Sequence, residues 1–317
     1  MSAIAFVIIG LVGLIIGGEL VVRGAVSAAK RFGISPMVIG LTLVGFGTST
    51  PELVTSLQAA LGGSPGIAIG NVVGSNISNV LLILGIAAIL APVAVNPAAF
   101  KRDGSVLVLA AILCLVVVLI GDVGRLAGVV FLITLAAYLT FTLVSEQRAT
   151  ATPAAAVYEA EAEAVLGPDY SLGISLIIAS VGLVLTILGA QFLVSGAVSL
   201  AQAAGVSETV IGLTIVAIGT SMPELVTSII AVRKGQGDVA LGNILGSNIF
   251  NILGILGLTA IVQPLSVPVQ IVQFDIWVML ATTLLLVTFA RTGWRIGRAE
   301  GGIMVASYFA YLGWLLI

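Results

Sequence analysis

Long apolar runs alternate with short polar segments along almost the whole chain, and most of these runs are longer than a buried helix of a soluble domain requires. A helix of about 20 apolar residues crosses a hydrocarbon layer of roughly 30 Å. The pattern therefore predicts an all-α polytopic membrane protein with ten transmembrane helices. The expected spans are 3–23, 36–61, 66–91, 104–121, 124–145, 171–195, 206–232, 238–262, 272–290 and 302–317.

Within this pattern, the segment 40–85 recurs as 212–257, and the two copies align from end to end without a gap. About 27 of the 46 aligned positions are identical, far more than the composition alone would give, so the chain contains an internal repeat. The first copy contains GTSTPELVTS and GSNISN, and the second contains GTSMPELVTS and GSNIFN. Polar residues and glycines are kept between the copies while apolar residues drift, which is the opposite of what packing against lipid would select.

The repeat divides the chain into two five-helix units, residues 1–145 and 171–317, joined by a linker at 146–170. Because five is an odd number, the second unit enters the membrane upside down relative to the first, as in many secondary transporters with inverted repeats. The fold we expect is therefore ten helices arranged as two inverted five-helix repeats.

The basic residues give an independent estimate of orientation, because cytoplasmic loops carry an excess of Lys and Arg. With the expected spans, eleven basic residues fall on one side and only Arg125 on the other. We therefore expect a multi-pass protein of the plasma (inner) membrane with both termini outside and the linker 146–170 in the cytoplasm. The eleven are Arg23, Lys30, Arg31, Lys101, Arg102, Arg148, Arg233, Lys234, Arg291, Arg295 and Arg298.

The first span could also be a cleaved signal peptide, since Ala25-Val26-Ser27 resembles a cleavage site. However, Gly10, Gly17 and Gly24 match Gly182, Gly189 and Gly196 at the same offset that relates 40–85 to 212–257. We therefore expect the first span to be retained as the partner of the sixth. Its glycines suit either a smooth sliding contact or close static packing.

The composition agrees with a membrane protein, but two single glutamates say more about its function. The 317 residues are 59% hydrophobic and 8% charged, yet each repeat carries a glutamate inside otherwise apolar sequence, Glu52 and Glu224. A carboxylate at membrane depth is costly unless it faces a polar cavity, a basic partner or a bound ion. All twelve basic residues fall in expected loops or span ends, which leaves a cation site or a proton relay.

The neighbours of the glutamates are oxygen donors. Thr48 and Ser49 precede Glu52 by four and three residues, so a helix places them on one face with it, and Thr220 and Ser221 repeat this around Glu224. Pro51 and Pro223 each free a backbone carbonyl one turn earlier. The repeats also offer Ser75 with Asn79 and Ser247 with Asn251.

Two carboxylates with hydroxyl, amide and carbonyl oxygens suit Ca²⁺, which takes six to eight oxygen ligands. Softer metals lack their ligands, because the chain has no His and its one cysteine, Cys114, lies outside the repeated motifs, where we expect a small core residue.

The motifs GTSTPELVTS with GSNISN, and GTSMPELVTS with GSNIFN, resemble the two α-repeats of the calcium/cation antiporter superfamily, and the prokaryotic Na⁺/Ca²⁺ exchanger type in particular. The resemblance implies that Glu52 and Glu224 bind Ca²⁺ with the backbone oxygens of Thr48 and Thr220. It implies that Na⁺ shares these glutamates, with Asn79 and Asn251 lining the centre. Further implied Na⁺ ligands are the hydroxyls of Ser49, Ser221, Ser75, Ser247, Thr48 and Thr220 and the backbone oxygens of Gly45 and Ala217.

The chain departs from the family pattern at Asn251, where many prokaryotic relatives carry Asp. In potassium-dependent relatives that Asp is linked to K⁺ use, so the resemblance lowers the expectation of K⁺ dependence. It further implies that the first and sixth helices slide over the core to expose the site to alternate sides.

We therefore expect a Na⁺/Ca²⁺ antiporter with Ca²⁺ and Na⁺ as transported ions, no prosthetic group, the lipid bilayer as its surroundings, no nucleic-acid partner and a functional monomer. A Ca²⁺/H⁺ exchanger is the alternative, because a buried glutamate can also carry protons, but a proton does not need the repeated hydroxyls. An intramembrane enzyme or a passive cation channel fits less well, because two equivalent glutamates in inverted repeats suit alternating access. We assign Asn71, Asn76, Asn243 and Asn248 to helix contacts rather than ligation, and Asp275 to helix-end electrostatics.

Overall fold

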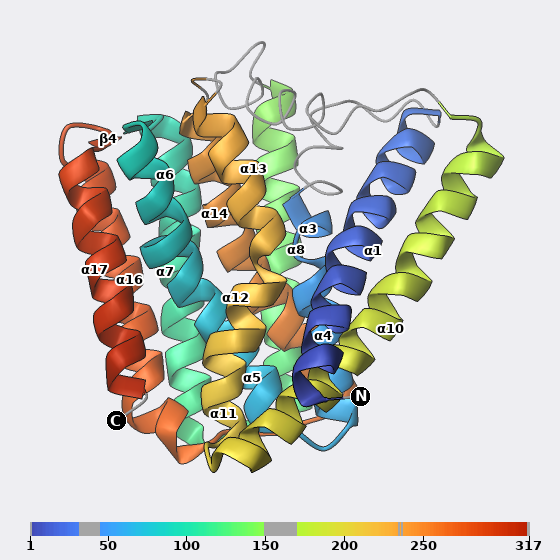
Figure 1. The fold of residues 1–317 in the computed structure, drawn as a ribbon. Coiled ribbons are helices and arrows are strands. Elements are labelled where there is room, and N and C mark those ends of the chain that lie inside the picture. The colour runs from blue at the N-terminus through green and yellow to red at the C-terminus, as the bar shows by residue number, and fades with distance from the viewer. Residues whose placement is uncertain (1, 32–44, 149–169, 234, 236, 316–317) are drawn as a thin grey trace.

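The computed structural model describes residues 2–31, 45–148, 170–233, 235 and 237–315. Nearly all of these residues are helical, and the helices form a bundle with its long axis vertical in Figure 1. Two long helices, α1 (Ala3–Arg31) and α10 (Leu172–Ala204), lie together along one side of this bundle. Both termini lie at the same end of the molecule, which we call the terminus end; the other we call the linker end.

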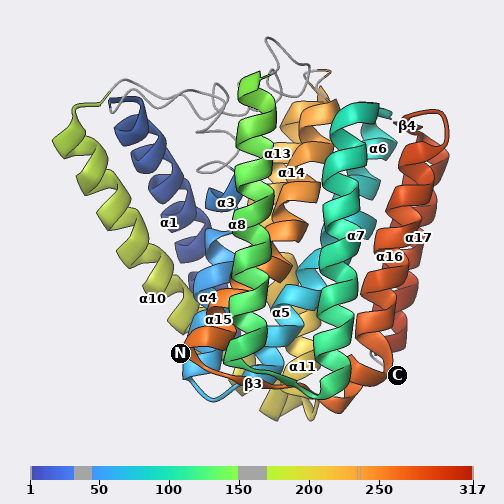
Figure 2. The same ribbon diagram turned by 180° about the vertical axis from the view of Figure 1, so that it is seen from behind.

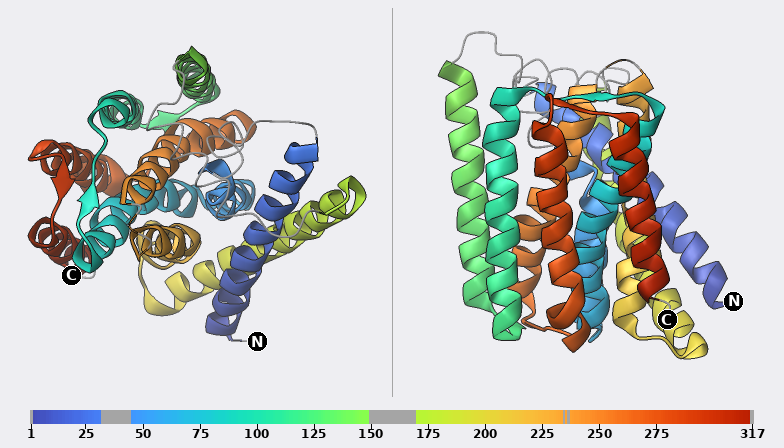
Figure 3. Two further views of the ribbon diagram at one scale, coloured as in Figure 1. Left: turned by 90° about the horizontal axis from the view of Figure 1, so that it is seen from above. Right: turned by 90° about the vertical axis from the view of Figure 1, so that its left-hand side faces the viewer.

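Two composite helices form the centre of the bundle (Figure 3), and most of their residues are buried. One consists of α5 (Pro65–Ser78), a π-helical turn η2 (Asn79–Leu84) and α6 (Gly85–Leu90). The other consists of α14 (Gly237–Phe250), η4 (Asn251–Leu256) and α15 (Gly257–Val262). Every boundary in the second composite helix falls at the repeat counterpart of the boundary in the first.

Two interrupted helices flank this centre. The first contains α3 (Gly45–Gly47) and α4 (Thr50–Leu61). The second contains α11 (Glu208–Ile211), the π-helical turn η3 (Gly212–Val216), α12 (Ala217–Thr220) and α13 (Met222–Arg233). The prolines of the predicted spans 36–61 and 206–232 indicate disturbed helices, and the described parts of both spans are broken at the serine that directly precedes the Thr-Pro or Met-Pro pair. The chain bends there by 45° between Glu208–Thr220 and Met222–Arg233.

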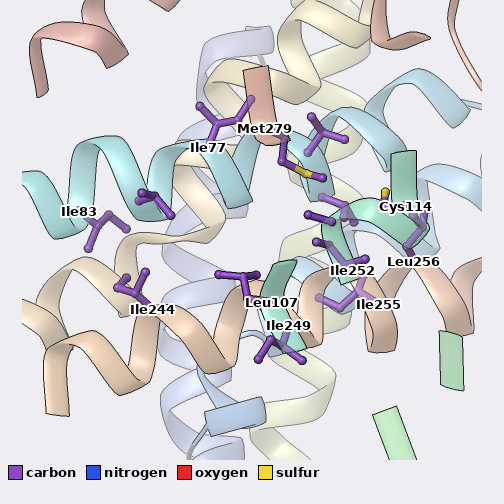
Figure 4. Packing of buried hydrophobic residues seen from close by; sticks show 14 of the residues in the cluster. Ile77, Ile83, Leu107, Cys114, Ile244, Ile249, Ile252, Ile255, Leu256 and Met279 are labelled. Atoms are coloured by element: carbon purple, nitrogen blue, oxygen red, sulfur yellow. The ribbon is translucent and has the colours of Figure 1, made fainter. Parts of the chain in front are cut away.

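Four more helices cover the side of the bundle opposite α1 and α10 (Figure 2). They are α7 (Pro97–Ile120), α8 (Arg125–Arg148), α16 (Ile276–Arg291), which the π-helical turn η5 (Ile271–Asp275) precedes, and α17 (Arg298–Leu315). A buried apolar cluster joins them to the central helices (Figure 4). In this cluster Leu107 and Cys114 of α7 and Met279 of α16 pack against Ile249, Ile252 and Leu256.

Two short antiparallel ribbons tie the loops together at opposite ends of the molecule (Figure 2). At the linker end β1 (Val93–Ala94) pairs with β4 (Arg295–Ile296), and at the terminus end β2 (Asp122–Val123) pairs with β3 (Leu265–Ser266). Each ribbon therefore joins a loop of the first half of the chain to a loop of the second half. One further backbone bond extends each ribbon, from Val95 to Trp294 and from Val267 to Gly121, both at 3.0 Å.

By length and composition, seven of the described helices could cross a membrane, or eight if the bent pair forms one span. This makes the chain a polytopic helical membrane protein. The count of ten spans stays a prediction, since part of 36–61 lies outside the described residues, as does most of the linker 146–170.

The structure corrects the ends of several predicted spans. The helices α1 and α10 run to Arg31 and Ala204 rather than to 23 and 195, and they contain 29 and 33 residues. Arg23 had marked the end of the first span, but its guanidinium pairs with Glu19 one turn earlier at 2.6 Å, so the helix continues past it. The helix α7 begins at Pro97 rather than at 104, because the side chain of Asn96 accepts hydrogen bonds from the first free amides.

Candidate cation site

The two glutamates lie where their helices restart after a break. Glu52 and Glu224 are the third residues of α4 and α13, and each follows a proline that cannot donate a backbone hydrogen bond. Both are fully buried, with 0% of their surface exposed. The breaks therefore place one carboxylate from each half of the chain in the interior, beside backbone that is not regularly helical.

Reciprocal hydrogen bonds connect the two halves at this point. Ser49 Oγ donates to Glu224 Oε1 at 3.1 Å, and Ser221 Oγ donates to Glu52 Oε1 at 2.9 Å. Ser49 lies at the break before Glu52 but contacts Glu224, and Ser221 lies at the break before Glu224 but contacts Glu52. Because each break thus supplies a carboxylate and a donor to the other, the two glutamates share a single site.

Several buried acceptor atoms around the glutamates have no hydrogen-bond partner within the described residues. Glu52 and Glu224 each leave Oε2 free while Oε1 accepts from the serine. A buried polar atom without a partner is costly and requires an explanation, of which a missing ion is one. The other unpartnered oxygens of predicted site residues are Thr48 Oγ1, Asn79 Oδ1 and Asn251 Oδ1.

The two asparagines begin the π-helical turns of the central helices. Asn79 is the first residue of η2 and Asn251 the first of η4, and both are fully buried. A single π-helical turn in a long helix shifts the backbone hydrogen-bond pattern and is often found at functional sites. Asn79 Nδ2 donates a hydrogen bond to Asn248 Oδ1 at 2.9 Å, and this bond joins the two central composite helices.

The remaining predicted site residues lie on the same elements. Ser247 Oγ donates to Glu224 Oε1 at 3.4 Å, so it belongs to the glutamate cluster. Ser75 Oγ instead points to the carbonyl of Ala217 at 3.5 Å, which also accepts from Thr220 Oγ1 at 3.4 Å. Gly45 is the first residue of α3, three positions before Thr48.

Asn71 has a larger role than the sequence predicted. Its amide nitrogen donates to the carbonyl of Glu52 at 3.2 Å and to Ser56 Oγ at 2.9 Å, and its oxygen accepts from Thr220 Oγ1 at 3.0 Å. It therefore connects three elements that position Glu52 without touching the carboxylate. The assignment of Asn71 to helix contacts was correct, but nothing in the spacing GNVVGSN identified these partners.

Within the part of the chain that the structure describes, no basic side chain forms an ion pair with either glutamate. Among the described residues the ion pairs are Arg23 with Glu19 and Arg102 with Asp103, and neither lies at the site. Nor do three or more His, Cys, Asp or Glu side chains of the described residues lie close enough together to hold a metal ion. Cys114 is buried in the apolar cluster, as predicted. The site thus combines two carboxylates with neutral oxygens, which is chemistry for a hard cation.

Comparison with known proteins agrees with this geometry. The sequence profile of a family described as "Sodium/calcium exchanger protein" matches residues 2–144 and 174–317. The chain belongs to the sodium/calcium exchanger family. It is 36% identical to the sodium/calcium exchanger MaX1 of Methanosarcina acetivorans, with 96% of each chain covered, and 41% identical to the putative antiporter CaxA of Alkalimonas amylolytica, with 98% of each chain covered.

The structure is also similar to that of an exchanger solved experimentally. The sodium-calcium exchanger NCX_Mj, soaked with Na⁺ and Sr²⁺, matches with a TM-score of 0.67 and 33% sequence identity over 98% of this chain and 97% of that one. As a member of this family the chain is a cation antiporter rather than a member of an enzyme family.

Proposed function

We propose that this protein exchanges Na⁺ for Ca²⁺ across the plasma (inner) membrane by alternating access. Two inverted five-helix repeats, 1–145 and 171–317, would enclose one central site, and the linker 146–170 would join them in the cytoplasm. The reciprocal hydrogen bonds of Ser49 with Glu224 and Ser221 with Glu52 support this proposal most directly. A site built from equivalent groups of two inverted repeats presents the same chemistry to both sides of the membrane.

The donor set supports Ca²⁺ and Na⁺ as the ions. Two carboxylates balance one divalent charge, and Ca²⁺ accepts the mixed oxygen ligands that the helix breaks provide. In our proposal Ca²⁺ binds Glu52, Glu224 and the backbone oxygens of Thr48 and Thr220, while Na⁺ shares the glutamates. The further Na⁺ ligands would be the hydroxyls of Ser49, Ser221, Ser75, Ser247, Thr48 and Thr220 and the carbonyls of Gly45 and Ala217, with Asn79 and Asn251 lining the centre.

Competition for the same glutamates explains why the transport is an exchange. An empty site would carry two unpaired carboxylates through the conformational change in surroundings that solvate them poorly. A bound Ca²⁺, or Na⁺ ions in its place, removes that cost. The protein can therefore change its conformation when the site holds ions but not when the site is empty. Ca²⁺ then crosses in one direction only when Na⁺ crosses in the other.

The deciding experiment is uptake of radioactive Ca²⁺ by proteoliposomes loaded with Na⁺, K⁺ or choline at matched pH. We expect uptake only with internal Na⁺, and loss of uptake in Glu52→Gln and in Glu224→Gln. Glu19→Gln is the matched control, because Glu19 is an exposed glutamate paired with Arg23 on α1. It should transport normally.

Other outcomes would exclude Na⁺ coupling. Uptake that ignores Na⁺ and follows an imposed pH gradient would make the protein a Ca²⁺/H⁺ exchanger. Uptake that needs no counter-ion would make it a channel.

A further inference from the structure

The bonds between serines and glutamates occur in both repeats, but the asparagines of the two central composite helices are bonded asymmetrically. Asn76 and Asn79 of the first helix are the repeat counterparts of Asn248 and Asn251 of the second. Asn79 Nδ2 donates to Asn248 Oδ1 at 2.9 Å, and Asn248 Nδ2 donates to the backbone carbonyl of Asn76 at 3.2 Å. The two counterpart bonds, from Asn251 to Asn76 Oδ1 and from Asn76 Nδ2 to the carbonyl of Asn248, are not formed between these described residues.

The side chain of Asn76 turns back onto its own helix instead. Its Nδ2 donates to the carbonyl of Val72, one turn earlier, at 2.8 Å. As a result Asn76 Oδ1 and Asn251 Nδ2 are both buried without a hydrogen-bond partner among the described residues. One is an acceptor and the other a donor, and they are the two atoms that the counterpart bond would join. A bound cation does not explain the Asn251 Nδ2, because an amide nitrogen only donates hydrogen bonds.

The bonding partners identify the nitrogen of each inner asparagine. A backbone carbonyl only accepts hydrogen bonds, so the Asn76 atom that faces the Val72 carbonyl is a nitrogen, as is the Asn248 atom that faces the Asn76 carbonyl. The other side-chain atom of each residue is therefore the oxygen. In Asn248 this oxygen has a donor, Asn79, and in Asn76 it has none.

This difference between the repeats is conformational rather than chemical. The two segments read GNVVGSNISN and GNILGSNIFN, so Asn76 and Asn248 both follow Gly-Ser and precede Ile. None of the four asparagines at positions 76, 79, 248 and 251 exposes more than 2% of its surface. The same buried side chain, in the same local sequence, thus takes two positions. In one it bonds to its own helix, and in the other it crosses to the other repeat.

A second pair of counterpart residues shows the same asymmetry. Thr220 Oγ1 donates to Asn71 Oδ1 at 3.0 Å, which joins α12 to α5. The counterpart donor, Thr48 Oγ1, is buried and has no hydrogen-bond partner among the described residues. At both places one bond of a symmetric pair is formed and the other is not. The two halves of the chain therefore differ in conformation next to the glutamates, although both bonds between serine and glutamate are present.

We propose that Asn76 and Asn248 are positioning residues that exchange their bonds when the site changes the side of the membrane to which it opens. This inference depends on the proposed function. In alternating access by inverted repeats, each repeat takes in one state the conformation that the other repeat takes in the opposite state. In the structure Asn248 crosses to Asn76 and binds Asn79, and Asn251 is unbonded. In the opposite state Asn76 crosses to Asn248 and binds Asn251, and Asn79 is released.

Single substitutions at the two positioning residues should therefore act on different states. Asn248→Ala removes both cross-repeat bonds of the state seen in the structure. Asn76→Ala leaves the backbone carbonyl that Asn248 uses, and in this state it removes only the bond to Val72. Its main effect falls on the opposite state, which loses the acceptor for Asn251. The two substitutions should shift the balance between the states in opposite directions.

The balance can be measured by Ca²⁺–Ca²⁺ exchange in right-side-out and in inverted membrane vesicles. The half-saturating Ca²⁺ concentration on one face rises as the state open to that face becomes less populated. The ratio of the half-saturating concentrations on the two faces therefore reports the balance. It is measured for the parent, Asn76→Ala, Asn248→Ala and the double variant. Ser78→Ala is the matched control, because Ser78 lies between Asn76 and Asn79 and its hydroxyl bonds within its own helix.

We expect Asn248→Ala to change this ratio about fivefold in one direction and Asn76→Ala to change it about fivefold in the other. The double variant should return close to the parent ratio, and Ser78→Ala should not change it. A purely structural role would lower activity without opposite shifts.

Shifts of both single variants in the same direction, or a ratio that neither of them changes, would overturn the proposal. If an alanine variant fails to fold, Asn76→Ser and Asn248→Ser replace the pair, and opposite shifts are again required. Ca²⁺–Ca²⁺ exchange needs no Na⁺, so failure of Na⁺-driven uptake would leave the ratio readable.

Discussion

At the scale of single residues, the site depends on serine hydroxyls that cross between the two halves of the chain. Ser221 contacts Glu52 and Ser49 contacts Glu224, so each carboxylate is oriented by the helix break of the other repeat. A hydrogen bond to a charged acceptor is worth about 1.5–3 kcal/mol, more than one between neutral groups. These two bonds therefore contribute both to the position of the carboxylates and to the contact between the two halves of the chain.

We predict that Ser49→Ala and Ser221→Ala each weaken apparent Ca²⁺ affinity by about tenfold or more. Ser221→Ala removes the donor to Glu52 Oε1, and Ser49→Ala removes the shorter of the two hydrogen bonds to Glu224 Oε1. The measurement is the Ca²⁺ concentration dependence of Na⁺-driven uptake. Ser78→Ala is the control, since the Ser78 hydroxyl bonds to the carbonyl of Ser75 and to neither glutamate. If all three variants had the same Ca²⁺ affinity as the parent protein, the Ser49 and Ser221 hydroxyls would not support the carboxylates.

How well these residues could be predicted depended on what each one bonds to. Glu52 and Glu224 stand out in the sequence because an unpaired carboxylate in an apolar run is costly wherever it folds. The partners of Asn71 could not be found in this way. They lie on two other elements, α4 and α12, and an asparagine in a glycine-containing helix is equally consistent with a simple helix contact.

At the scale of helices, the glycines of α1 and α10 pack these two helices against each other. A Cβ on Gly10 would lie 2.5 Å from the Leu193 nitrogen, and one on Gly189 would lie 2.7 Å from the Leu14 nitrogen. Of the two explanations left open by the sequence, close packing accounts for these positions, and sliding of the pair over the core stays a prediction. Such contacts between membrane helices depend on small residues because their backbones approach closely.

Replacing one of these glycines should separate the pair. We predict that Gly189→Ala lowers thermal stability by about 1–3 kcal/mol, the usual cost of forcing an extra methyl group into a packed contact. Gly173→Ala at the start of α10 should have almost no effect, because nothing lies within 4 Å of a Cβ there. Thermal unfolding in detergent compares the two variants. A Gly189→Ala protein as stable as the parent would mean that the helices can separate without cost.

A second pair of related contacts distinguishes α16 from α7. Tyr138 donates to Asp103 at 3.0 Å and Tyr311 donates to Asp275 at 2.9 Å, but Asp103 also pairs with Arg102 at 2.6 Å. The residue of the second repeat that corresponds to Arg102 is Phe274, so Asp275 has no arginine directly before it. Asp275 is nevertheless fully buried. Assigning Asp275 to helix-end electrostatics was therefore incomplete, because the residue that holds it lies far away in sequence on α17.

This difference predicts unequal effects of the same substitution. Tyr311→Phe should cost about 2–4 kcal/mol of stability, since it removes the donor to Asp275 Oδ1 while Oδ2 already lacks a partner within the described residues. Tyr138→Phe should cost less, because Asp103 keeps its arginine. Unfolding temperatures measured in one detergent test this order. Asp275→Asn combined with Tyr311→Phe should recover part of the loss, as an amide is cheaper to bury than a charge.

At the scale of the whole molecule, the sequence correctly predicted a polytopic helical membrane protein, but it did not predict where several of the helices end. The offset between the two repeats recurs in every boundary of the two central composite helices, because the same residues fold in the same way in both copies. The π-helical turns and the breaks at Ser49 and Ser221 were not visible as periodicity. Both features interrupt the backbone hydrogen bonding of a helix without interrupting the run of apolar residues, so a hydropathy average does not detect them.

The same whole-molecule view predicts how the ions stabilise the protein. If Ca²⁺ and Na⁺ use the same glutamates, each should raise the unfolding temperature alone, and saturating Na⁺ should reduce the further rise produced by Ca²⁺. A ligand present at about 100 times its Kd stabilises the folded state by about 2.7 kcal/mol, and two competing ligands cannot add such contributions. The single cysteine, Cys114, is fully buried and reports unfolding through a thiol-reactive dye. Glu52→Gln/Glu224→Gln should abolish both shifts, while Glu19→Gln should retain them. Fully additive shifts in the parent would place Na⁺ and Ca²⁺ at separate sites and would contradict exchange by competition.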